Sequence, residues 1–308
     1  MRYLVTGGAG FIGAALANRL ATSGHEVRAL DDLSAGDSGR LDPKVLFTRA
    51  DVNDTPKLWT LLQGVDCVYH LAARVSVPES ILYPREYNAT NVGGTVSLLE
   101  AMRAVGVGRL VFSSSGAVYG EQEKQPLQED FTPDPRSPYA VSKLAAEYYV
   151  RTCGMLWGIE AVSLRIFNAY GAWQQLPAAH PPVIPQFIRH AQRGGSIIIH
   201  GDGRQTRDYI YIDDVVDALV AASTALHVDR EVINIGSGAE TSVNDLVREI
   251  GIVLGKDVQP LHSATQSGGV SHMRAGLEKA RQLLNFTPKI TLAEGLRRTV
   301  ILDSRFQG

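Results

Sequence analysis

The chain has 308 residues, of which 44% are hydrophobic and 20% are charged, and its formal net charge at pH 7 is −2. This composition is typical of a globular protein with one large or two modest domains, and the small net charge gives no reason to expect a nucleic-acid or membrane partner. The N-terminus lacks the zones of a signal peptide, and the two cysteines have no disulfide spacing, so we expect a cytoplasmic protein. The eight histidines show no metal-ligand spacing, so we expect no metal site.

Apolar runs alternate with helical patterns along the first half of the chain. The runs predicted as strands are residues 2–6, 26–30, 66–71, 109–115 and 160–167. Helical patterns lie between them at residues 11–24, 55–64, 91–106 and 137–154. Nearly continuous apolar strands that alternate with helices are typical of a parallel sheet covered on both faces, so the sequence predicts a doubly wound α/β fold.

The composition changes after Asn168, where a stretch rich in Pro, Ala and Gln is too irregular for another strand–helix unit. We interpret this stretch as the entry to a second, smaller domain. Residues 208–236 again show an apolar helix and strand, and we expect them to return to the first domain, which otherwise spans 1–168. The second domain is then expected to consist of 169–207 and 237–308.

A glycine-rich turn, GGAGFIG at 7–13, follows the first strand and opens the first helix. Such turns let backbone N–H groups approach a pyrophosphate at the positive end of the helix. Asp31 lies 18 residues beyond Gly13 at the end of the second strand, where a carboxylate can accept both adenosine ribose hydroxyls and repel a 2′-phosphate. We therefore expect NAD rather than NADP; the alternative is that Asp31 and Asp32 belong to a solvated loop. The contacts expected from this part of the chain are Gly7, Gly10, Phe11, Ile12, Gly13, Asp31 and Asp32.

SPYAVSK at 137–143 places Tyr139 four residues before Lys143, on one face of a predicted helix. The spacing alone arises by chance, but Ser115 ends a strand at the sheet edge where open α/β folds bind ligands. A lysine cation and a nicotinamide charge would favour the phenolate of a tyrosine, whose free pKa is about 10. Lowering that pKa by about three units requires about 4 kcal/mol, and the resulting phenolate is a base for an alcohol proton.

The motifs, taken in chain order, resemble those of the extended short-chain dehydrogenases/reductases that modify sugar nucleotides, above all the UDP-galactose (UDP-glucose) 4-epimerases. The resemblance is carried by VTGGAGFIG, DDLSAG, HLAA at 70–73, NVGGT at 91–95, SSSGAVYG at 113–120, SPYAVSK, RIFNAYG at 165–171, VIPQFI at 183–188, RDYIYIDD at 207–214 and INIGSG at 233–238. It implies a Rossmann-type fold with a small C-terminal substrate-binding domain, and C4 epimerisation with bound NAD.

The same resemblance implies roles for individual residues and a homodimer. Ser115, Tyr139 and Lys143 would be catalytic. The cofactor would be lined by Asp51, Val52, Leu71, Ala72, Ala73, Asn91 and Ser113, in addition to Tyr139 and Lys143. The substrate would be held by Ser115, Asn168, Val183, Arg207 and Gln266. Two subunits would pair through residues 94–105 and 138–153, the second of which is expected to expose Ala140, Leu144, Ala145, Tyr148 and Tyr149.

The chain departs from the family pattern at the substrate loop. Gln266 stands where an arginine usually clamps the diphosphate, Gly269 replaces an aspartate and Trp173 replaces a basic residue. Losing a charge-assisted contact costs about 1.5–3 kcal/mol, so we expect weak affinity for UDP-glucose and UDP-galactose or a pocket for a different sugar or nucleotide, unless Arg274 compensates. Met273 lies near the position that, in the family, limits the size of the substituent accepted at C2 of the sugar.

Two positions before the VYG element bear on the reaction type. Gly116 and Ala117 carry no acid, whereas related dehydratases and decarboxylases have one there, so elimination is disfavoured. The alternatives to a 4-epimerase are another nucleotide-sugar oxidoreductase or epimerase and, less favoured, a non-catalytic NAD-binding protein.

Overall fold

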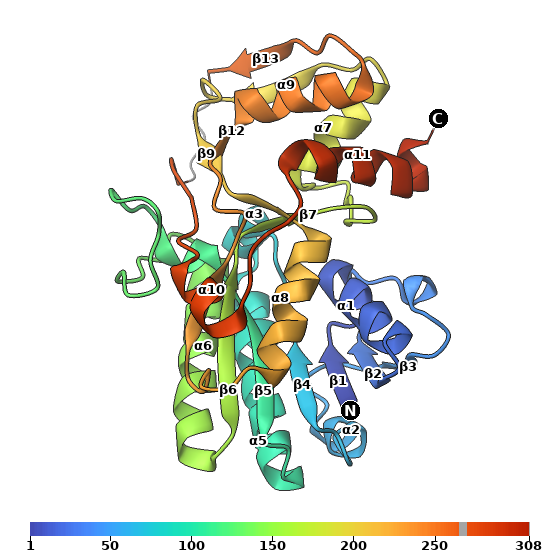
Figure 1. Ribbon diagram of the computed structural model, residues 1–308, viewed down its shortest axis with the longest axis vertical. Helices are drawn as coiled ribbons and strands as arrows, with labels where there is room; N and C mark the ends of the chain where they lie inside the picture. Colours follow the sequence, from blue (N-terminus) through green and yellow to red (C-terminus); the bar gives the residue numbers. More distant parts are fainter. Residues whose placement is uncertain (265–269, 308) are drawn as a thin grey trace.

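The computed structural model describes residues 1–264 and 270–307, and its larger part is built on one parallel sheet (Figure 1). Seven strands lie in the order β11-β6-β5-β4-β1-β2-β3. Their bounds are β1 Arg2–Thr6, β2 Glu26–Asp31, β3 Leu46–Arg49, β4 Cys67–His70, β5 Arg109–Ser115, β6 Glu160–Ile166 and β11 Val232–Ile235. This confirms the predicted doubly wound α/β fold and adds β3, a partly exposed edge strand that the hydrophobic pattern did not reveal.

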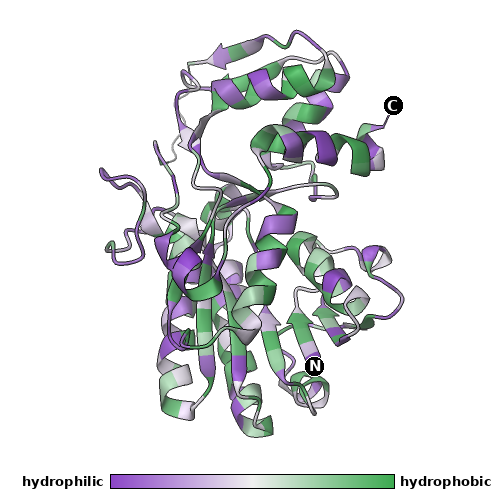
Figure 2. Cartoon of the chain, in the orientation of Figure 1, coloured by the Kyte–Doolittle hydropathy of each residue, from purple (hydrophilic) through white to green (hydrophobic). Residues whose placement is uncertain are grey.

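Helices cover both faces of the sheet. On one face, α1 (Phe11–Thr22) and α8 (Ile212–Thr224) pack together over a core that includes Val5, Leu16 and Val215. On the other face lie α2 (Thr55–Leu61), α5 (Gly94–Val105) and α6 (Pro138–Trp157), over a second core that includes Leu98. The hydropathy colouring shows these strands as largely apolar, as expected for a sheet buried on both sides (Figure 2).

The segment before α5 is more complex than the single helix predicted from residue 91. It consists of α3 (Val77–Leu82), α4 (Pro84–Tyr87) and a π-helical turn at Asn88–Gly93 that continues directly into α5. Pi-helical turns are uncommon and often mark functional positions. This turn places Asn91 inside the molecule, with 1% of its surface exposed.

The smaller part of the molecule stands above the carboxyl ends of the strands, toward which the strand arrows point in Figure 1. Outside the large sheet, the described residues form three two-stranded sheets: β12–β9 and β13–β8 belong to this smaller part, while β10–β7 contacts both α8 of the larger part and α11 (Leu292–Leu302). The strand bounds are β7 Asn168–Tyr170, β8 Ile197–His200, β9 Thr206–Arg207, β10 Tyr209–Tyr211, β12 Thr241–Ser242 and β13 Pro260–Ser263. The helices of this part are α7 Val183–Gln192, α9 Val243–Leu254 and α11, whereas α10 Glu278–Leu284 packs beside β11 and α8 of the larger part (Figure 1). Throughout the described ranges, no helix is both long and apolar enough to span a bilayer.

Candidate active site

The end of β5 and the first turns of α6 bring the three residues expected to be catalytic together. Helix α6 begins at Pro138, and the side chain of Ser137 caps it by accepting a hydrogen bond from the backbone of Ala140 at 3.1 Å. One turn later, the Nζ of Lys143 donates to the carbonyl oxygen of Ser113 at 2.7 Å. Two of the three ammonium N–H groups therefore remain for other partners.

Burial is the largest influence on the pKa values of Tyr139 and Lys143. Tyr139 is 9% exposed, and burial raises its pKa, while a hydrogen bond with the side chain of Ser115 lowers the pKa in part. Lys143 is 3% exposed, and burial lowers its pKa to about 7. The sequence suggested that Lys143 lowers the pKa of Tyr139 directly, but its ammonium is bonded to Ser113. Here Ser115 is the side chain that favours the phenolate.

The glycine turn has the shape that a bound pyrophosphate requires. Gly7 has a φ of +68°, and a Cβ there would come within 2.6 Å of the backbone of Ala72. A Cβ on Gly13 would lie 2.0 Å from the carbonyl oxygen of Gly7, so glycine is required for helix and turn to approach this closely. The first turn of α1 begins at Phe11 directly after this turn. These residues fit a dinucleotide.

Asp31 lies beside the glycine turn at the end of β2. Its carboxylate is 8% exposed and accepts hydrogen bonds from the backbone of Ala9 at 3.0 Å and of Leu33 at 2.9 Å. Burial raises the pKa of this carboxyl. Asp32 is exposed and bonds to Ser34 in its own loop, so the two acids have different environments.

A buried chain of hydrogen bonds supports the cofactor side of the site. Thr95 donates to the carbonyl oxygen of Asn91 at 2.6 Å, so it accepts from the Nε2 of His70 at 2.9 Å. The Nδ1 of His70 then accepts from Thr6 at 2.7 Å. Burial lowers the pKa of His70 to about 3, which keeps the ring neutral. His70 was not singled out in the sequence.

The loop after β4 is fixed by this chain and by Asn91. The side chain of Asn91 accepts from the backbone N–H of Arg74 at 2.8 Å and donates to the Arg74 carbonyl oxygen at 3.0 Å and to Ser142 at 2.9 Å. The side chain of Asn91 thus connects the loop at Arg74 to Ser142 on α6. The half-buried residues that follow β4 are Leu71, Ala72 and Ala73, while Asp51 is exposed and Val52 is buried beyond β3.

The described residues expected at the nucleotide end of the substrate come from β7, β9 and α7. Asn168 pairs with Tyr209 between β7 and β10, and its backbone donates to the carbonyl oxygen of Asp208 at 3.0 Å. Arg207 precedes these residues in β9 and donates to the carbonyl oxygen of Val270 at 2.8 Å, and burial lowers its pKa. Val183 starts α7. Gln266 and Gly269 lie outside the described residues.

Trp173 joins the two parts of the molecule. Its backbone donates to Asp303 at 2.7 Å, and the guanidinium carbons of Arg40 and Arg305 each lie 5.7 Å from its ring centroid. Arg40 also donates to the Trp173 carbonyl oxygen at 2.8 Å. Two arginine side chains therefore lie beside this position, where the family pattern has a basic residue.

The residues next to Ser115 are crowded at Gly116. A Cβ there would lie 3.2 Å from the ring of Phe167. Phe167 belongs to an apolar cluster with Val118, Leu127 and Met273. Met273 itself is 7% exposed. A side chain at 116 would thus require the aromatic ring of Phe167 to shift by a few tenths of an ångström.

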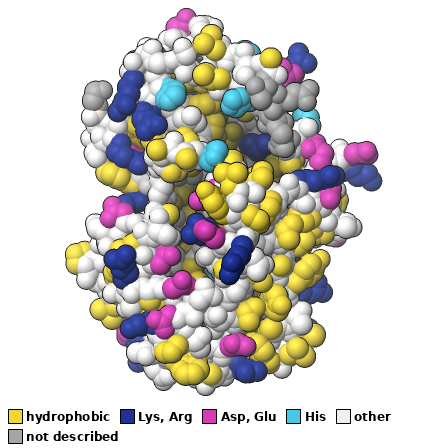
Figure 3. Space-filling view, turned by 180° about the vertical axis from the view of Figure 1, so that it is seen from behind, with side chains coloured by type: hydrophobic (Ala, Val, Ile, Leu, Met, Phe, Trp, Pro, Cys, Tyr) yellow, Lys and Arg dark blue, Asp and Glu magenta, His cyan; other side chains and the backbone are white. Residues whose placement is uncertain are grey.

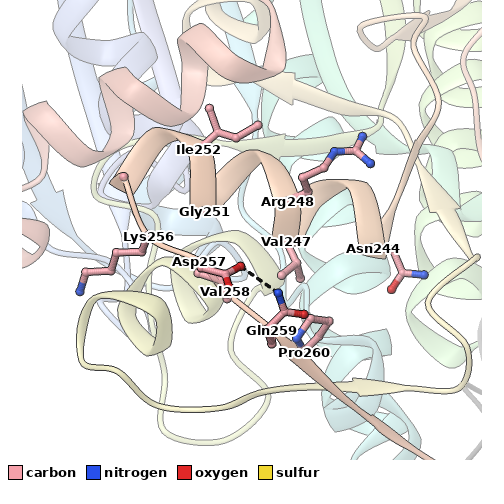
Figure 4. Close-up of a pocket in the computed structure, with 11 residues that line it drawn as sticks. Asn244, Val247, Arg248, Gly251, Ile252, Lys256, Asp257, Val258, Gln259 and Pro260 are labelled. Atoms are coloured by element: carbon pink, nitrogen blue, oxygen red, sulfur yellow. Dashed lines mark hydrogen bonds between the residues drawn. The ribbon is translucent and has the colours of Figure 1, made fainter.

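A surface groove of 530 Å³ lies elsewhere, between α9 and β13 (Figure 4). Its charged side chains include Arg248 and Lys256, and Asp257 accepts a hydrogen bond from Gln259 at 2.8 Å. It contains none of the expected catalytic residues, so we do not place the reaction there. In the described ranges, no group of three or more His, Cys, Asp and Glu side chains has the arrangement of a metal site.

Comparison with known proteins shows what this site belongs to. Residues 3–236 match the NAD dependent epimerase/dehydratase family. The chain is 38% identical over 307 residues to the UDP-glucose 4-epimerase of Mycolicibacterium smegmatis, with 97% of each chain covered. It superposes with a TM-score of 0.95 and 35% identity on the UDP-glucose 4-epimerase of Thermotoga maritima solved with UDP-glucose, over 100% of both chains.

Relatives with other sugars are similarly close. The UDP-N-acetylglucosamine 4-epimerase of Methanobrevibacter ruminantium superposes with a TM-score of 0.92 and 33% identity, over 97% of this chain and 96% of that one. Overall similarity therefore does not separate the sugars. The family itself is established: this chain belongs to the NAD-dependent epimerases and dehydratases.

Proposed function

We propose that this protein epimerises C4 of a nucleotide sugar of the UDP-glucose/UDP-galactose type through a transient 4-keto sugar. The observation that carries the proposal is the arrangement of Tyr139, Ser115 and Lys143 at the edge of the sheet, on the side where the glycine turn would hold NAD.

The three side chains have complementary tasks in this proposal. Tyr139, as phenolate, takes the proton of the C4 hydroxyl and returns it after the sugar has presented its other face. Ser115, whose side chain lowers the pKa of Tyr139, holds the same substrate oxygen. Lys143 keeps its ammonium directed into the site from Ser113. Bound NAD supplies a hydride acceptor that is restored at the end of each cycle.

Substrate binding would fall to the smaller part of the molecule, which we take as 169–207 and 237–308, with 1–168 and 208–236 forming the NAD-binding domain. Asn168, Val183 and Arg207 would contact the nucleotide end, together with Gln266. Arg274 is a further candidate for the diphosphate, because its Nε is buried and has no hydrogen-bond partner among the described residues.

Epimerisation is favoured over elimination by the crowding at Gly116, since a dehydratase needs a second acid near C5 or C6. The remaining alternative is an epimerase or oxidoreductase that acts on a different sugar or nucleotide. A non-catalytic NAD-binding protein is less favoured because the Tyr139, Lys143 and Ser115 side chains remain together.

The proposal includes a homodimer formed through α5 and α6. Tyr148, Tyr149 and Val141 on α6 are 52%, 45% and 51% exposed, and hydrophobic side chains gather on this side of the molecule, at the lower right of Figure 3. The expectation that Ala140 is exposed was wrong: it is 1% exposed, because it faces the core beside Tyr139. A cytoplasmic location is also part of the proposal, since both cysteines are free.

The test is a panel of UDP-, dTDP-, GDP- and CDP-sugars, with C4 epimers scored by NMR and reduced nicotinamide followed by absorbance. We expect epimers of UDP-glucose and UDP-galactose without net accumulation of reduced nicotinamide. Net accumulation would indicate an oxidoreductase, and turnover of only another sugar nucleotide would select the alternative. Arg274→Ala should raise the Michaelis constant of the preferred sugar nucleotide if Arg274 replaces the missing clamp.

A further inference from the structure

Directly behind the proposed catalytic group lies a buried ion pair with no task assigned above. The carboxylate of Glu147 on α6 accepts from Arg165 on β6 at 3.1 Å (Nε to Oε2) and at 2.7 Å (Nη2 to Oε1). Both side chains are 4% exposed. A buried pair of this kind is a weak source of stability, because desolvating the two charges offsets much of their attraction. Its position therefore calls for another explanation.

The pair is tied to the strand that carries Ser115. Ser114 donates to the Oε2 of Glu147 at 2.7 Å, and Ser114 is the register partner of Arg165 across β5 and β6. Ser114 lies between Ser113, whose carbonyl oxygen accepts from Lys143, and Ser115. Glu147 thus connects α6 to two strands at the level of the site.

Glu147 follows Lys143 by four residues on the same helix, a spacing at which a lysine and a glutamate normally face each other. Within the described part of the chain, however, Lys143 forms no ion pair, and its ammonium bonds to Ser113 instead. Both oxygens of Glu147 are occupied by Arg165, with Ser114 as a second donor to one of them.

Arg165 is held in turn from its other side. Its guanidinium carbon lies 4.6 Å from the ring centroid of Tyr119, and the Tyr119 hydroxyl donates to Asn234 at 2.7 Å. The Nη1 of Arg165 has no hydrogen-bond partner among the described residues. The aromatic face is thus the contact that fixes this end of the guanidinium.

We propose that Arg165 and Glu147 act as a positioning pair: Arg165 keeps the Glu147 carboxylate away from Lys143, so that the ammonium stays on Ser113 and is available to the reacting groups. This inference rests on the catalytic roles proposed for Tyr139 and Lys143.

The pair then controls the pH range of the reaction. The titratable and charged groups around Lys143 are His70 on β4, Tyr139 and Glu147 on α6, and Arg165 on β6; His70 stays neutral because burial lowers its pKa to about 3. Without the Arg165 cation, the carboxylate of Glu147 would raise the pKa of both Lys143 and Tyr139. Without the Glu147 carboxylate, the unpaired guanidinium of Arg165 would lower the pKa of both Lys143 and Tyr139.

The experiment compares the pH dependence of kcat in variants with opposite charge changes. Arg165→Met should move the profile up by about one pH unit, and Glu147→Gln should move it down by a similar amount. The double variant Arg165→Met/Glu147→Leu removes both charges, a change that buried pairs often tolerate, and should keep the original profile. Opposite shifts in the single variants cannot come from loosened packing alone.

A matched control lies at the other end of β5. Arg109 bonds to Glu160 at 2.7 Å and to the carbonyl oxygens of Ala222 and Ala225, so Arg109→Met should lower stability without moving the profile. If Arg165→Met or Glu147→Gln folds and keeps the original profile, or if the double variant shifts it, the inference is wrong. Tyr139→Phe separates the two claims, since an inactive Tyr139→Phe with unmoved profiles overturns the positioning role and leaves the proposed function standing.

Discussion

The ammonium of Lys143 and the carbonyl oxygen of Ser113 form a 2.7 Å hydrogen bond between α6 and β5 with almost no contact with solvent. The bond fixes the helix against the strand at the level of Ser115. It also keeps a cation in a place where burial lowers its pKa to about 7, from an ordinary value of 10.5. Burying this ammonium lowers the stability of the fold, which is expected of a residue kept for its part in the reaction.

Lys143→Met should therefore make the NAD-free protein more stable at pH 6 while abolishing turnover. A 3.5-unit lowering of the pKa corresponds to a cost of roughly 5 kcal/mol for the buried ammonium, and losing its hydrogen bond offsets about 1–3 kcal/mol, so we expect a net gain of about 2–4 kcal/mol. Because the unfolded lysine holds its proton to higher pH than the folded one, the stability of the original protein rises from pH 7 toward 10.5. The gain should shrink over that window in urea unfolding, and a gain that grows with pH would contradict the assignment.

Tyr139→Phe should lower kcat by about 10²–10⁴-fold, the usual contribution of a general acid–base group. The ring still fills its place, so NAD should stay bound and the melting temperature should change little. Tyr148→Phe is the matched control, because Tyr148 lies on the same helix with 52% of its surface exposed. Comparable rates for the two variants would remove Tyr139 from the reaction.

Asp31→Asn should weaken the preference for NAD over NADP by about tenfold or more, because it removes the charge that repels a 2′-phosphate. The amide has a single acceptor oxygen, so it can keep only one of the two bonds from the backbone of Ala9 and Leu33, and the ratio of the two nucleotide affinities is therefore the quantity to compare. Calorimetric titration with both nucleotides measures the change. Asp42→Asn, which alters a carboxylate bonded to the backbone of Lys44 further along the chain, should leave the preference intact.

Tyr149→Glu should convert a dimer into a monomer, since it places a charge on the apolar face of α6. Ile301→Glu, on α11, adds the same charge at a side chain that is 65% exposed and should not affect assembly. Light scattering at micromolar concentration distinguishes the two masses. A monomer before any substitution would refute the dimer.

The sequence predicted those parts of the molecule whose geometry is set locally. The glycine turn is one of them, because Gly7 and Gly13 have no room for a side chain, and the Tyr139–Lys143 spacing is another, because one helix carries both residues. The partly exposed strand at Leu46–Arg49 was missed because it lies at the sheet edge and lacks an apolar run.

Long-range polar contacts could not be predicted. Glu147 and Arg165 are 18 positions apart and meet only because β6 lies beside β5, and His70 finds Thr6 and Thr95 only in the folded sheet. The one local signal was that Glu147 follows Lys143 by one helical turn. The exposure of Ala140 was misjudged because the hydrophobic pattern of α6 does not show which apolar side chains face the core.

The measurement that tests hydride transfer at C4 most directly uses UDP-galactose labelled with deuterium at C4. The label should be found at C4 of the UDP-glucose formed, with no exchange into water, because a hydride that leaves for NAD returns to the same carbon. Loss of the label to solvent, or a sugar inverted at another carbon, would contradict the account.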